Sequence, residues 1–489
     1  MANTDSSSQN QELQLMREEL ELASPERHDW SRLLLEILSF FNADSIPESI
    51  LTENKPLYAQ SKADLLFEVV PFHIAVKDLL DAGLLIKIGT AFSMDQLVQQ
   101  ATLDQMTSVR RNRTFQIAVD CLFAVFPKPV EGGLSFMSES EQRCYYYQPH
   151  VGSIQRRYLQ FKIDVGTTRR HFAELLTNCS WYLYEKCMFA KAVEMASTAK
   201  DSLELIEDQD QWLLADAMTA IGNASLVSGA PRAQEAYDTL YHALRNRVKL
   251  VYAGVYSFDH PQIANAYMSR AAGALGLARI AEAIKLAENA VRLRQQSPQI
   301  QMQMLAMSHI NAGIIYLAGG QLDSADTQAG YALDVSEHLE GNAEKVMDVR
   351  NALLAGRIDL AKGNLDSASQ LLNVAFYFQL EYFGKMHLDT GLVYFNVAKI
   401  ARLRGDYRTA LENCRLALAV LHGMTYVESS EMRVLYMIGV LMEKLGDSEG
   451  AREKAYARRS YRRLYGTDLP DDDEAAMWEL DAKVHPFYR

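Results

Sequence analysis

The sequence lacks most of the features that reveal a protein's chemistry at sight. Its 489 residues contain only five cysteines, which are dispersed and form no C-x-x-C pair. An odd and scattered set argues against a disulfide framework and against a structural zinc site, so we expect small core thiols in a reducing compartment. The eleven histidines show no metal-ligand spacing. The sequence therefore predicts no metal ion and no other cofactor.

Long apolar stretches are also missing. The longest ones, such as residues 434–442, contain glycine and are too short to cross a bilayer. The opening residues, MANTDSSSQNQELQ, have no apolar signal-peptide core. We therefore expect no membrane partner and a cytoplasmic location, with the nucleus as the alternative.

Positive charge is in short supply. The formal net charge is −13 and the pI is about 5.4. Binding to bulk nucleic acid or to an anionic membrane needs a net positive surface, so the composition argues against both. Only a local basic patch is compatible with these totals.

Catalytic signatures are absent as well. We find no H-E-x-x-H, no G-x-S-x-G and no G-x-G-x-x-G after a strand. His242, His309 and His338 lie at repeat positions that packing or solvation explains, and the acidic run at 471–474 is interpreted as a solvated turn. No catalytic residue is predicted, although an unrecognised enzyme with a pocket in the repeats stays an alternative.

What the sequence does contain is a repeat of about 42 residues. Its clearest copy carries small residues and one tyrosine at Gly313, Tyr316, Gly320, Ala325, Ala329 and Ala332. Small residues let two helices cross closely, and the glycine at 320 ends the first helix. Each copy is thus two helices and a tight turn, which cannot bury its apolar face alone. We predict an all-α solenoid with a long concave surface.

Seven copies fit one register over residues 173–458. One alanine marks the start of the second helix in each copy: Ala192, Ala236, Ala283, Ala325, Ala368, Ala410 and Ala451. Residues 459–489 are predicted to form a capping helix with an acidic tail that covers the apolar face of the last repeat, as solenoid ends require.

The N-terminal part has a different pattern. Residues 1–25 are polar and are predicted to be a disordered leader. Residues 26–110 suggest three helices, a small hairpin and a further helix, with Pro47 early in the second helix. This order indicates a winged-helix-like module, but its third helix offers Lys77 against Asp78 and Asp81 and is not suited to reading bases. We expect no nucleic-acid partner.

Residues 111–172 are predicted to be connecting helices. They contain the tract RCYYYQPHVGSIQRRY, with three adjacent tyrosines at 145–147 beside arginines. Tyrosines in this setting pack at an interface or, alternatively, stack on a nucleotide base. If the chain is an enzyme, its pocket lies at this junction or within the solenoid.

The repeats resemble the tetratricopeptide repeat. The resemblance rests on the order large, small, aromatic, glycine, alanine, seen at His309, Gly313, Tyr316, Gly320 and Ala325. The period is longer than the standard of about 34 residues and is similar to the extended variant of kinesin light chains and fungal receptor-like proteins. The segment DHPQIANA at 259–266 is similar to the inter-repeat signature of that variant.

The N-terminal module adds a second resemblance. The segments WSRLLLEILSFFNADSIPESIL, AVKDLLDAGLL and FSMDQLVQQATLDQM resemble the winged-helix segment between the nucleotide-binding module and the repeats of fungal NOD-like NB-ARC–tetratricopeptide proteins. No G-x-x-x-x-G-K-[ST] loop occurs, so the NTPase of that family is absent from this sequence. The resemblance implies the sensor half of such a receptor, and a fungal origin.

The first helix of each repeat is expected to line the concave surface. Its groove-facing positions in the last three repeats are predominantly basic: Arg350, Arg357, Lys399, Arg402, Arg433 and Tyr436. Earlier repeats present aromatic, amide and apolar residues: Trp181, Tyr184, Asn223, Asn265, Met268, Met307 and Ile314. An arginine cluster suits a carboxylate-rich or phosphorylated peptide. Alternatively, these charges pair with acidic residues of adjacent repeats.

The sequence thus predicts a non-catalytic scaffold that binds a protein or peptide, with acidic character, in its concave groove. An accessory or regulatory role in a fungal specialised-metabolite pathway is the alternative on the same scaffold. Reversing the charge of Arg357 and Lys399 is expected to abolish partner capture with thermal stability nearly unchanged. The sequence does not predict an oligomeric state.

Overall fold

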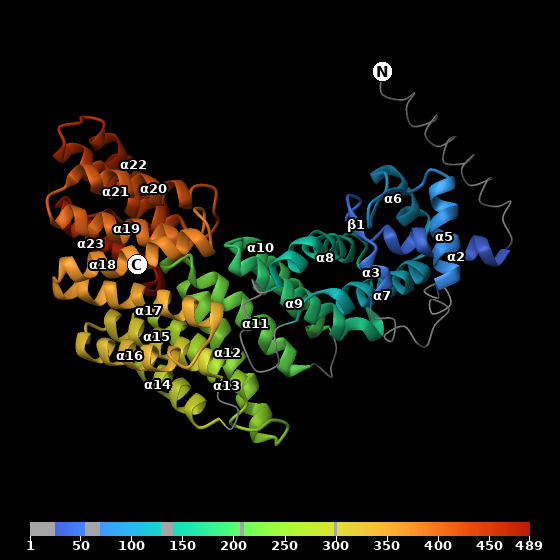
Figure 1. Ribbon diagram of the computed structural model, residues 1–489, viewed down its shortest axis with the longest axis horizontal. Helices are drawn as coiled ribbons and strands as arrows, with labels where there is room; N and C mark the ends of the chain where they lie inside the picture. Colours follow the sequence, from blue (N-terminus) through green and yellow to red (C-terminus); the bar gives the residue numbers. More distant parts are fainter. Residues whose placement is uncertain (1–24, 54–68, 129–139, 206–209, 298–300) are drawn as a thin grey trace. The chain divides into compact units, whose positions relative to one another are not determined.

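The computed structural model describes residues 25–53, 69–128, 140–205, 210–297 and 301–489. Within these ranges the chain is all-α except for one small sheet, and it forms two compact units (Figure 1). The first unit contains the described residues up to 182 together with Thr198–Leu213, and the second contains Leu183–Ser197 and Leu214–Arg489. Residues 1–24 of the predicted leader lie outside the described ranges.

Amphipathic helices build the core of the first unit. Their bounds are α2 (Pro25–Leu38), α3 (Ser49–Thr52), α5 (Val69–Asp81), α6 (Gln96–Gln105), α7 (Ser108–Val125) and α8 (Glu141–Phe161). Two of them begin at side-chain caps, since Asp95 accepts from Leu97 N and Thr107 accepts from Arg110 N. The core is aromatic, with Phe40 and Phe115 fully buried and their rings 5.3 Å apart edge to face.

A three-stranded antiparallel sheet completes this unit. The strands β1 (Ile46–Pro47), β2 (Ile86–Ile88) and β3 (Ala91–Ser93) lie in the order β1-β3-β2. The hairpin after α5 is where the sequence predicts it. Pro47 is predicted early in the second helix but lies in β1. β1 is an edge strand of the sheet, and an edge strand tolerates proline because one of its sides forms no ladder hydrogen bonds. The winged-helix assignment of this module remains a prediction.

The tyrosines of α8 have different surroundings. Tyr147 is buried and its hydroxyl lies 2.8 Å from Ser49 Oγ of α3. The side chains of Tyr145 and Tyr146 are 69 % and 52 % exposed. Tyr147 therefore packs within the first unit, whereas its two neighbours face solvent.

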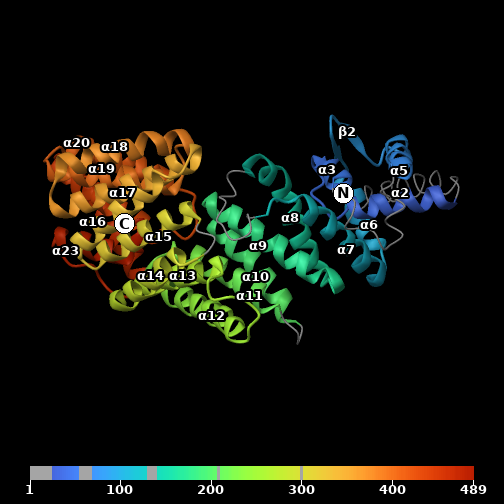
Figure 2. The same ribbon diagram turned by 60° about the horizontal axis from the view of Figure 1, so that its bottom comes forward.

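Seven consecutive helix pairs follow in the described part of the chain, as the repeat predicts (Figure 2). They are α9 (Arg169–Glu185) and α10 (Phe189–Glu204), α11 (Gln211–Leu226) and α12 (Ala233–Tyr252), α13 (Pro261–Gly276) and α14 (Ile280–Gln295), α15 (Met302–Ala318) and α16 (Leu322–Ser336), α17 (Gly341–Lys362) and α18 (Leu365–Tyr382), α19 (Leu388–Leu403) and α20 (Tyr407–Leu421), α21 (Glu428–Lys444) and α22 (Gly450–Tyr465). From α12 onward each pair packs on the next, which makes a tetratricopeptide-type solenoid.

Small residues set the helix crossings, as the register predicts for six of the seven copies. The register alanines from 192 to 410 are fully buried. In the last pair Ala451 is exposed and Gly450 is buried instead. A Cβ on Gly439 would lie 2.7 Å from Gly450 O, and a Cβ on Gly450 would lie 2.5 Å from Gly439 O. The predicted register is thus wrong by one residue here, because the α21–α22 crossing is a backbone contact between two glycines.

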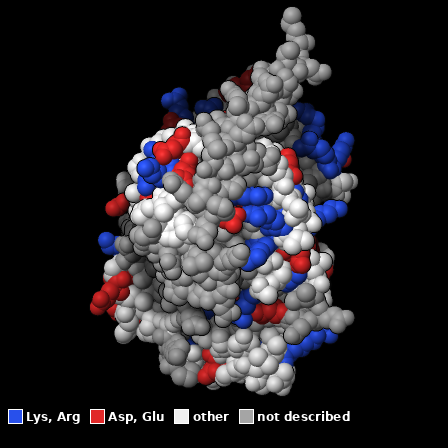
Figure 3. All heavy atoms as spheres, turned by 90° about the vertical axis from the view of Figure 1, so that its right-hand side faces the viewer, with Lys and Arg blue, Asp and Glu red and all other residues white. Residues whose placement is uncertain are grey.

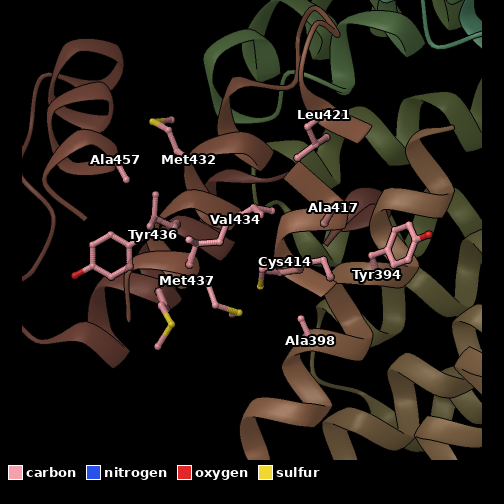
Figure 4. Packing of buried hydrophobic residues seen from close by; sticks show 14 of the residues in the cluster. Tyr394, Ala398, Cys414, Ala417, Leu421, Met432, Val434, Tyr436, Met437 and Ala457 are labelled. Carbon is pink, nitrogen blue, oxygen red and sulfur yellow. The ribbon is translucent and has the colours of Figure 1, made fainter. Parts of the chain in front are cut away.

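The last two pairs share one large apolar cluster (Figure 4). Its members include Tyr394 and Ala398 of α19, Cys414 of α20, and Val434 and Met437 of α21. Cys414 is one of five cysteines that are all buried free thiols, as predicted for core residues. This cluster fixes the positions of the α19 and α21 side chains on the inner surface.

Two short elements follow the repeats: α23 (Asp473–Lys483) and a 3-10 turn, η5 (Pro486–Tyr488). The predicted boundary at 458/459 falls inside α22, and those at 110/111 and 172/173 fall inside α7 and α9. The chain's C-terminus lies beside α17 in the views of Figure 1 and Figure 2. In the described ranges, no helix combines the length and apolar character needed to cross a membrane.

Candidate functional site

Residues 481–489, which we call the groove segment, lie on the inner surface of the second unit. The surface that contacts them, which we call the groove, is formed by α13, α15, α17, α19 and α21 and by the C-terminal ends of α9 and α11. Five of the six predicted stripe residues contact the groove segment or α23. The predicted basic stripe is therefore occupied by a later part of the same chain.

Asp481 lies between two cations of the stripe. Its Oδ2 is 2.8 Å from Lys399 Nζ of α19, and its Oδ1 is 3.3 Å from Arg433 Nη1 of α21. Burial alone would raise the pKa of Asp481, but Lys399 and Arg433 outweigh burial and bring the pKa down to about 2. Asp481 is therefore an ionised partner for both cations at neutral pH.

Two arginines hold the backbone of the groove segment. Arg357 of α17 donates from Nη2 to Pro486 O at 2.6 Å, and Arg433 donates from its other Nη to Tyr488 O at 3.1 Å. Arg357 is 9 % exposed, and burial, with repulsion from Arg433, lowers its pKa to about 10. It remains charged at neutral pH, so a buried cation is satisfied by a peptide carbonyl.

The remaining stripe residues of α19 and α21 contact the start of α23. Arg402 Nη1 is 2.6 Å from Glu474 Oε1, and Tyr436 donates to Asp473 Oδ1 at 2.7 Å. Asp473 also pairs with Lys454 of α22 at 2.9 Å. The predicted solvated turn at 471–474 is therefore wrong for Asp473, which is partly buried by these contacts, whereas Glu474 stays exposed while it pairs with Arg402.

Arg350 is the sixth stripe residue and lies about two turns earlier on α17 than Arg357. Its Nη1 approaches Met307 Sδ of α15 at 3.8 Å. The alternative that the stripe pairs with acidic residues of adjacent repeats fits Lys399 and Arg433 poorly, because the carboxylate they share comes from Asp481.

His485 anchors the far part of the groove segment. Its Nε2 lies 3.0 Å from Ala272 O of α13, and its Nδ1 accepts from Phe487 N at 3.3 Å. The ring is 2 % exposed, and burial lowers its pKa to about 4. The two contacts together fix a neutral imidazole protonated on Nε2.

Aromatic and glycine residues shape the end of the groove. Phe487 packs against an apolar cluster that contains Leu226 and Leu240, and the hydroxyls of Tyr488 and Tyr184 are 3.0 Å apart. Gly229, after α11, has φ +68°, and a Cβ on it would lie 2.2 Å from Lys483 O. Only glycine permits both that backbone conformation and that close approach.

Sequence reasoning placed the stripe but missed its occupant. Asp481, His485 and Gly229 are not among the site residues that the sequence predicts. One signal was available: His485-Pro486 repeats the His260-Pro261 dipeptide, and in both cases the histidine caps the following turn through Nδ1. A second His-Pro in the sequence therefore marks another ordered turn on the solenoid rather than a solvated tail.

On the face shown in Figure 3, the visible Lys and Arg side chains are interspersed with Asp and Glu. Two basic residues of the stripe, Arg357 and Arg433, are instead buried against the groove segment, with Arg433 only 4 % exposed. The expectation that charge reversal at Arg357 and Lys399 leaves stability unchanged is therefore revised, since both side chains contact the groove segment.

The comparisons with known proteins concern the fold. A family model described as a domain of unknown function, DUF7779, matches residues 23–111. No curated protein matches the chain. The solved structures that resemble it include a Rap protein complexed with competence and sporulation factor, at 13 % identity and TM-score 0.47, covering 79 % of this chain and 92 % of that one.

Two further structures carry similar repeats. A STAND protein with a tetratricopeptide repeat sensor from Pyrococcus horikoshii has 14 % identity and TM-score 0.37, covering 96 % of this chain and 66 % of that one. TPR-like repeats of a kinesin light chain from P. anserina have 15 % identity and TM-score 0.34, covering 42 % of this chain and 99 % of that one. Likeness at this level supports no inference about ligands.

Proposed function

We propose that this protein is a non-catalytic interaction scaffold whose groove binds a peptide segment that carries an acidic residue followed by aromatic residues. The observation that supports this most directly is the carboxylate of Asp481 held between Lys399 and Arg433. The groove is matched to an occupant of this chemistry, and a segment of a partner protein would use the same contacts.

Three kinds of contact give the groove its selectivity. The two cations recognise a carboxylate, and hydrogen bonds that involve a charged group are each worth about 1.5–3 kcal/mol. Arg357 recognises a backbone carbonyl, which favours a turn whose carbonyl points outward. The apolar cluster at Phe487 provides a pocket for an aromatic ring. A short peptide can satisfy all three at once.

The basic residues also explain why the occupant must be anionic. Arg433 lowers the pKa of Arg357, and both arginines lower the pKa of Lys399, because the three cations lie close together. Their mutual repulsion in a partly buried groove is offset by the Asp481 carboxylate and the peptide carbonyls, with the ring of Phe395 beneath Lys399 and Arg433. A neutral or basic peptide would leave this charge uncompensated.

The proposal is tested by letting the groove segment bind from outside the chain. A protease site inserted after the exposed Gly466, once cleaved, converts residues 467–489 into a dissociable peptide. A fluorescent peptide of residues 471–489 should then bind the nicked protein saturably in fluorescence anisotropy. Asp481→Asn in this peptide should weaken binding roughly 10- to 30-fold, because the charge-assisted contacts are lost.

The matched control is Trp478→Ala in the same peptide. Trp478 is on α23 and 73 % exposed, so its removal should leave the affinity within about twofold. Equal binding of the Asp481→Asn and unchanged peptides would refute a carboxylate-recognising groove, as would failure of the unchanged peptide to bind at all.

Binding of this peptide should weaken in mild acid because of His485. Its pKa is 6.5 when unperturbed and about 4 when docked, so the free peptide takes up a proton that the docked one excludes. The lowered pKa therefore favours docking above pH 6.5, and this advantage is lost as the pH falls toward 4. From pH 7 to pH 5 the affinity should drop about 20-fold.

Asp481, with a pKa of about 2, stays ionised over this range, and Arg489, the charged group that acts on His485, does not titrate. His485→Gln in the peptide should therefore bind more weakly but with little dependence on pH between 5 and 7. If the unchanged and His485→Gln peptides show the same pH profile, the assigned neutral imidazole is incorrect.

The proposal also covers the family relationship of the N-terminal module. Residues 26–110 are assigned as a winged-helix-like module related to that of fungal NOD-like proteins, supported by the succession of helices, β1 and the β2–β3 hairpin. On this reading the solenoid is the sensor part of such a protein, acting in the cytoplasm. Measurable duplex DNA binding by the intact protein at physiological salt would argue against a module that only packs.

A further inference from the structure

We infer that the groove segment is an intramolecular ligand that keeps the groove closed, and that a partner opens it by presenting a segment of the same chemistry. This inference rests on the proposed function, because it concerns the state of the same groove. It adds a regulatory step: the groove is filled in the resting chain, and binding is an exchange.

The region after the repeats has two parts with different attachments. Ala476, Met477 and Leu480 of α23 belong to the apolar cluster of the last two helix pairs, so α23 is anchored as a cap. Beyond Asp481 the segment forms hydrogen bonds with individual side chains or carbonyls of successive helices, and its aromatic residues Phe487 and Tyr488 are only partly buried neighbours of the apolar clusters. The groove segment can therefore leave while α23 stays docked.

The cores of the middle repeats do not depend on the groove segment. The cluster of α17, α18 and α19 contains no residue beyond Ile400. From the groove segment, the cluster of α13 and α14 receives only Phe487, as one of its partly buried neighbours. Release of the segment would expose Arg357, Lys399 and Arg433 to water, where each can be hydrated. The solenoid then presents an open cationic groove without unfolding.

Tethering explains why the resting groove is closed. A segment joined to its site by a short connection acts at an effective concentration in the millimolar range. A free peptide with identical contacts must compete with that concentration, so the intact chain should bind it at least about 100-fold more weakly than a chain with a released segment.

The docked segment also specifies the partner. Asp481 is followed four residues later by His485, then by Pro486 and two aromatic residues, and each of these makes a separate contact with the groove. The partner that displaces it should carry an acidic residue four positions before a histidine or similar turn-forming residue, with an aromatic residue one or two positions after that turn.

The experiment compares three full-length proteins with one probe, an N-acetylated fluorescent peptide of residues 481–489, which omits the part of α23 that stays docked. They are the unchanged chain, the Asp481→Lys variant and, as the matched control, the Trp478→Ala variant. In Asp481→Lys the groove segment places a third positive charge next to Lys399 and Arg433. We expect Asp481→Lys to bind the probe at least about 100-fold more tightly than the other two. Thermal melting of each protein verifies that the solenoid is folded.

The outcomes separate the two proposals. Equal, tight binding to all three proteins would mean an open groove and would overturn the inference while the proposed function stands. No binding to Asp481→Lys or to the nicked chain would overturn both. Should Asp481→Lys fail to fold, the nicked chain takes its place, and at least about 100-fold tighter binding than to the intact chain supports the inference. A concentration-dependent dimer that excludes the probe would refute an intramolecular ligand in favour of a second copy.

Discussion

Replacing Gly229 by valine should abolish docking of the groove segment. A Cβ at this position would lie 2.2 Å from Lys483 O, a backbone atom that cannot rotate away, and the φ of +68° is unfavourable for a β-branched residue. Lys483 lies between the contacts of Asp481 and His485, so displacing its carbonyl disturbs both. The affinity of the nicked protein for the 471–489 peptide should fall by about 1000-fold in fluorescence anisotropy.

Gly254 provides the control for backbone strain. Its φ is +72°, but a Cβ there would meet nothing within 4 Å. Gly254→Val imposes a similar conformational penalty with no contact to the groove segment, and the peptide should bind this variant as it binds the unchanged chain. If Gly229→Val and Gly254→Val weaken binding equally, the close approach of Gly229 to Lys483 has no role in recognition.

Gly439→Val should cause a large loss of stability in the last helix pair. The α21–α22 crossing brings the two backbones into contact, since a Cβ on Gly439 would lie 2.7 Å from Gly450 O. Neither backbone can yield unless the helices separate, so the free energy of unfolding should fall by about 3 kcal/mol or more. Because repeats contact mainly their neighbours, the loss should be confined to this end of the solenoid.

Hydrogen exchange resolved by segment measures this effect directly. Amides of α21 and α22 should lose protection in Gly439→Val, while those of α13 and α14 keep it. Gly330 of α16, where a Cβ meets nothing within 4 Å, serves for comparison, and Gly330→Ala should be neutral or slightly stabilising. Loss of protection throughout the solenoid would show that the repeats unfold as one unit instead.

The repeats were predictable because their signal is local. A glycine that ends the first helix and an alanine at the crossing act within one helix pair, and the chain repeats them at nearly constant spacing. The prediction failed at Ala451, where Gly450 takes the packing position. One residue of slippage is invisible in the sequence, because either small residue satisfies the pattern and only the approach of Gly439 decides between them.

The groove was predictable only in part. The basic residues follow from helix periodicity, which gives the inward face of each first helix. Their occupant does not, because the ion pair of Lys399 and Asp481 joins residues 82 positions apart and depends on where the chain goes after α22. An acidic turn before a short helix has the same composition whether it is solvated or docked. His485-Pro486 was the one local indication of order.

The burial of every cysteine gives this chain an unusual suitability for site-directed labelling. Burial raises the pKa of the Cys187 and Cys414 thiols to about 12, so the reactive thiolate is scarce at neutral pH, and Cys121, Cys144 and Cys179 are equally inaccessible. A cysteine placed at exposed position 478 would react with a maleimide dye in an otherwise native background. Release and return of the neighbouring groove segment then become visible as fluctuations in the brightness of single molecules.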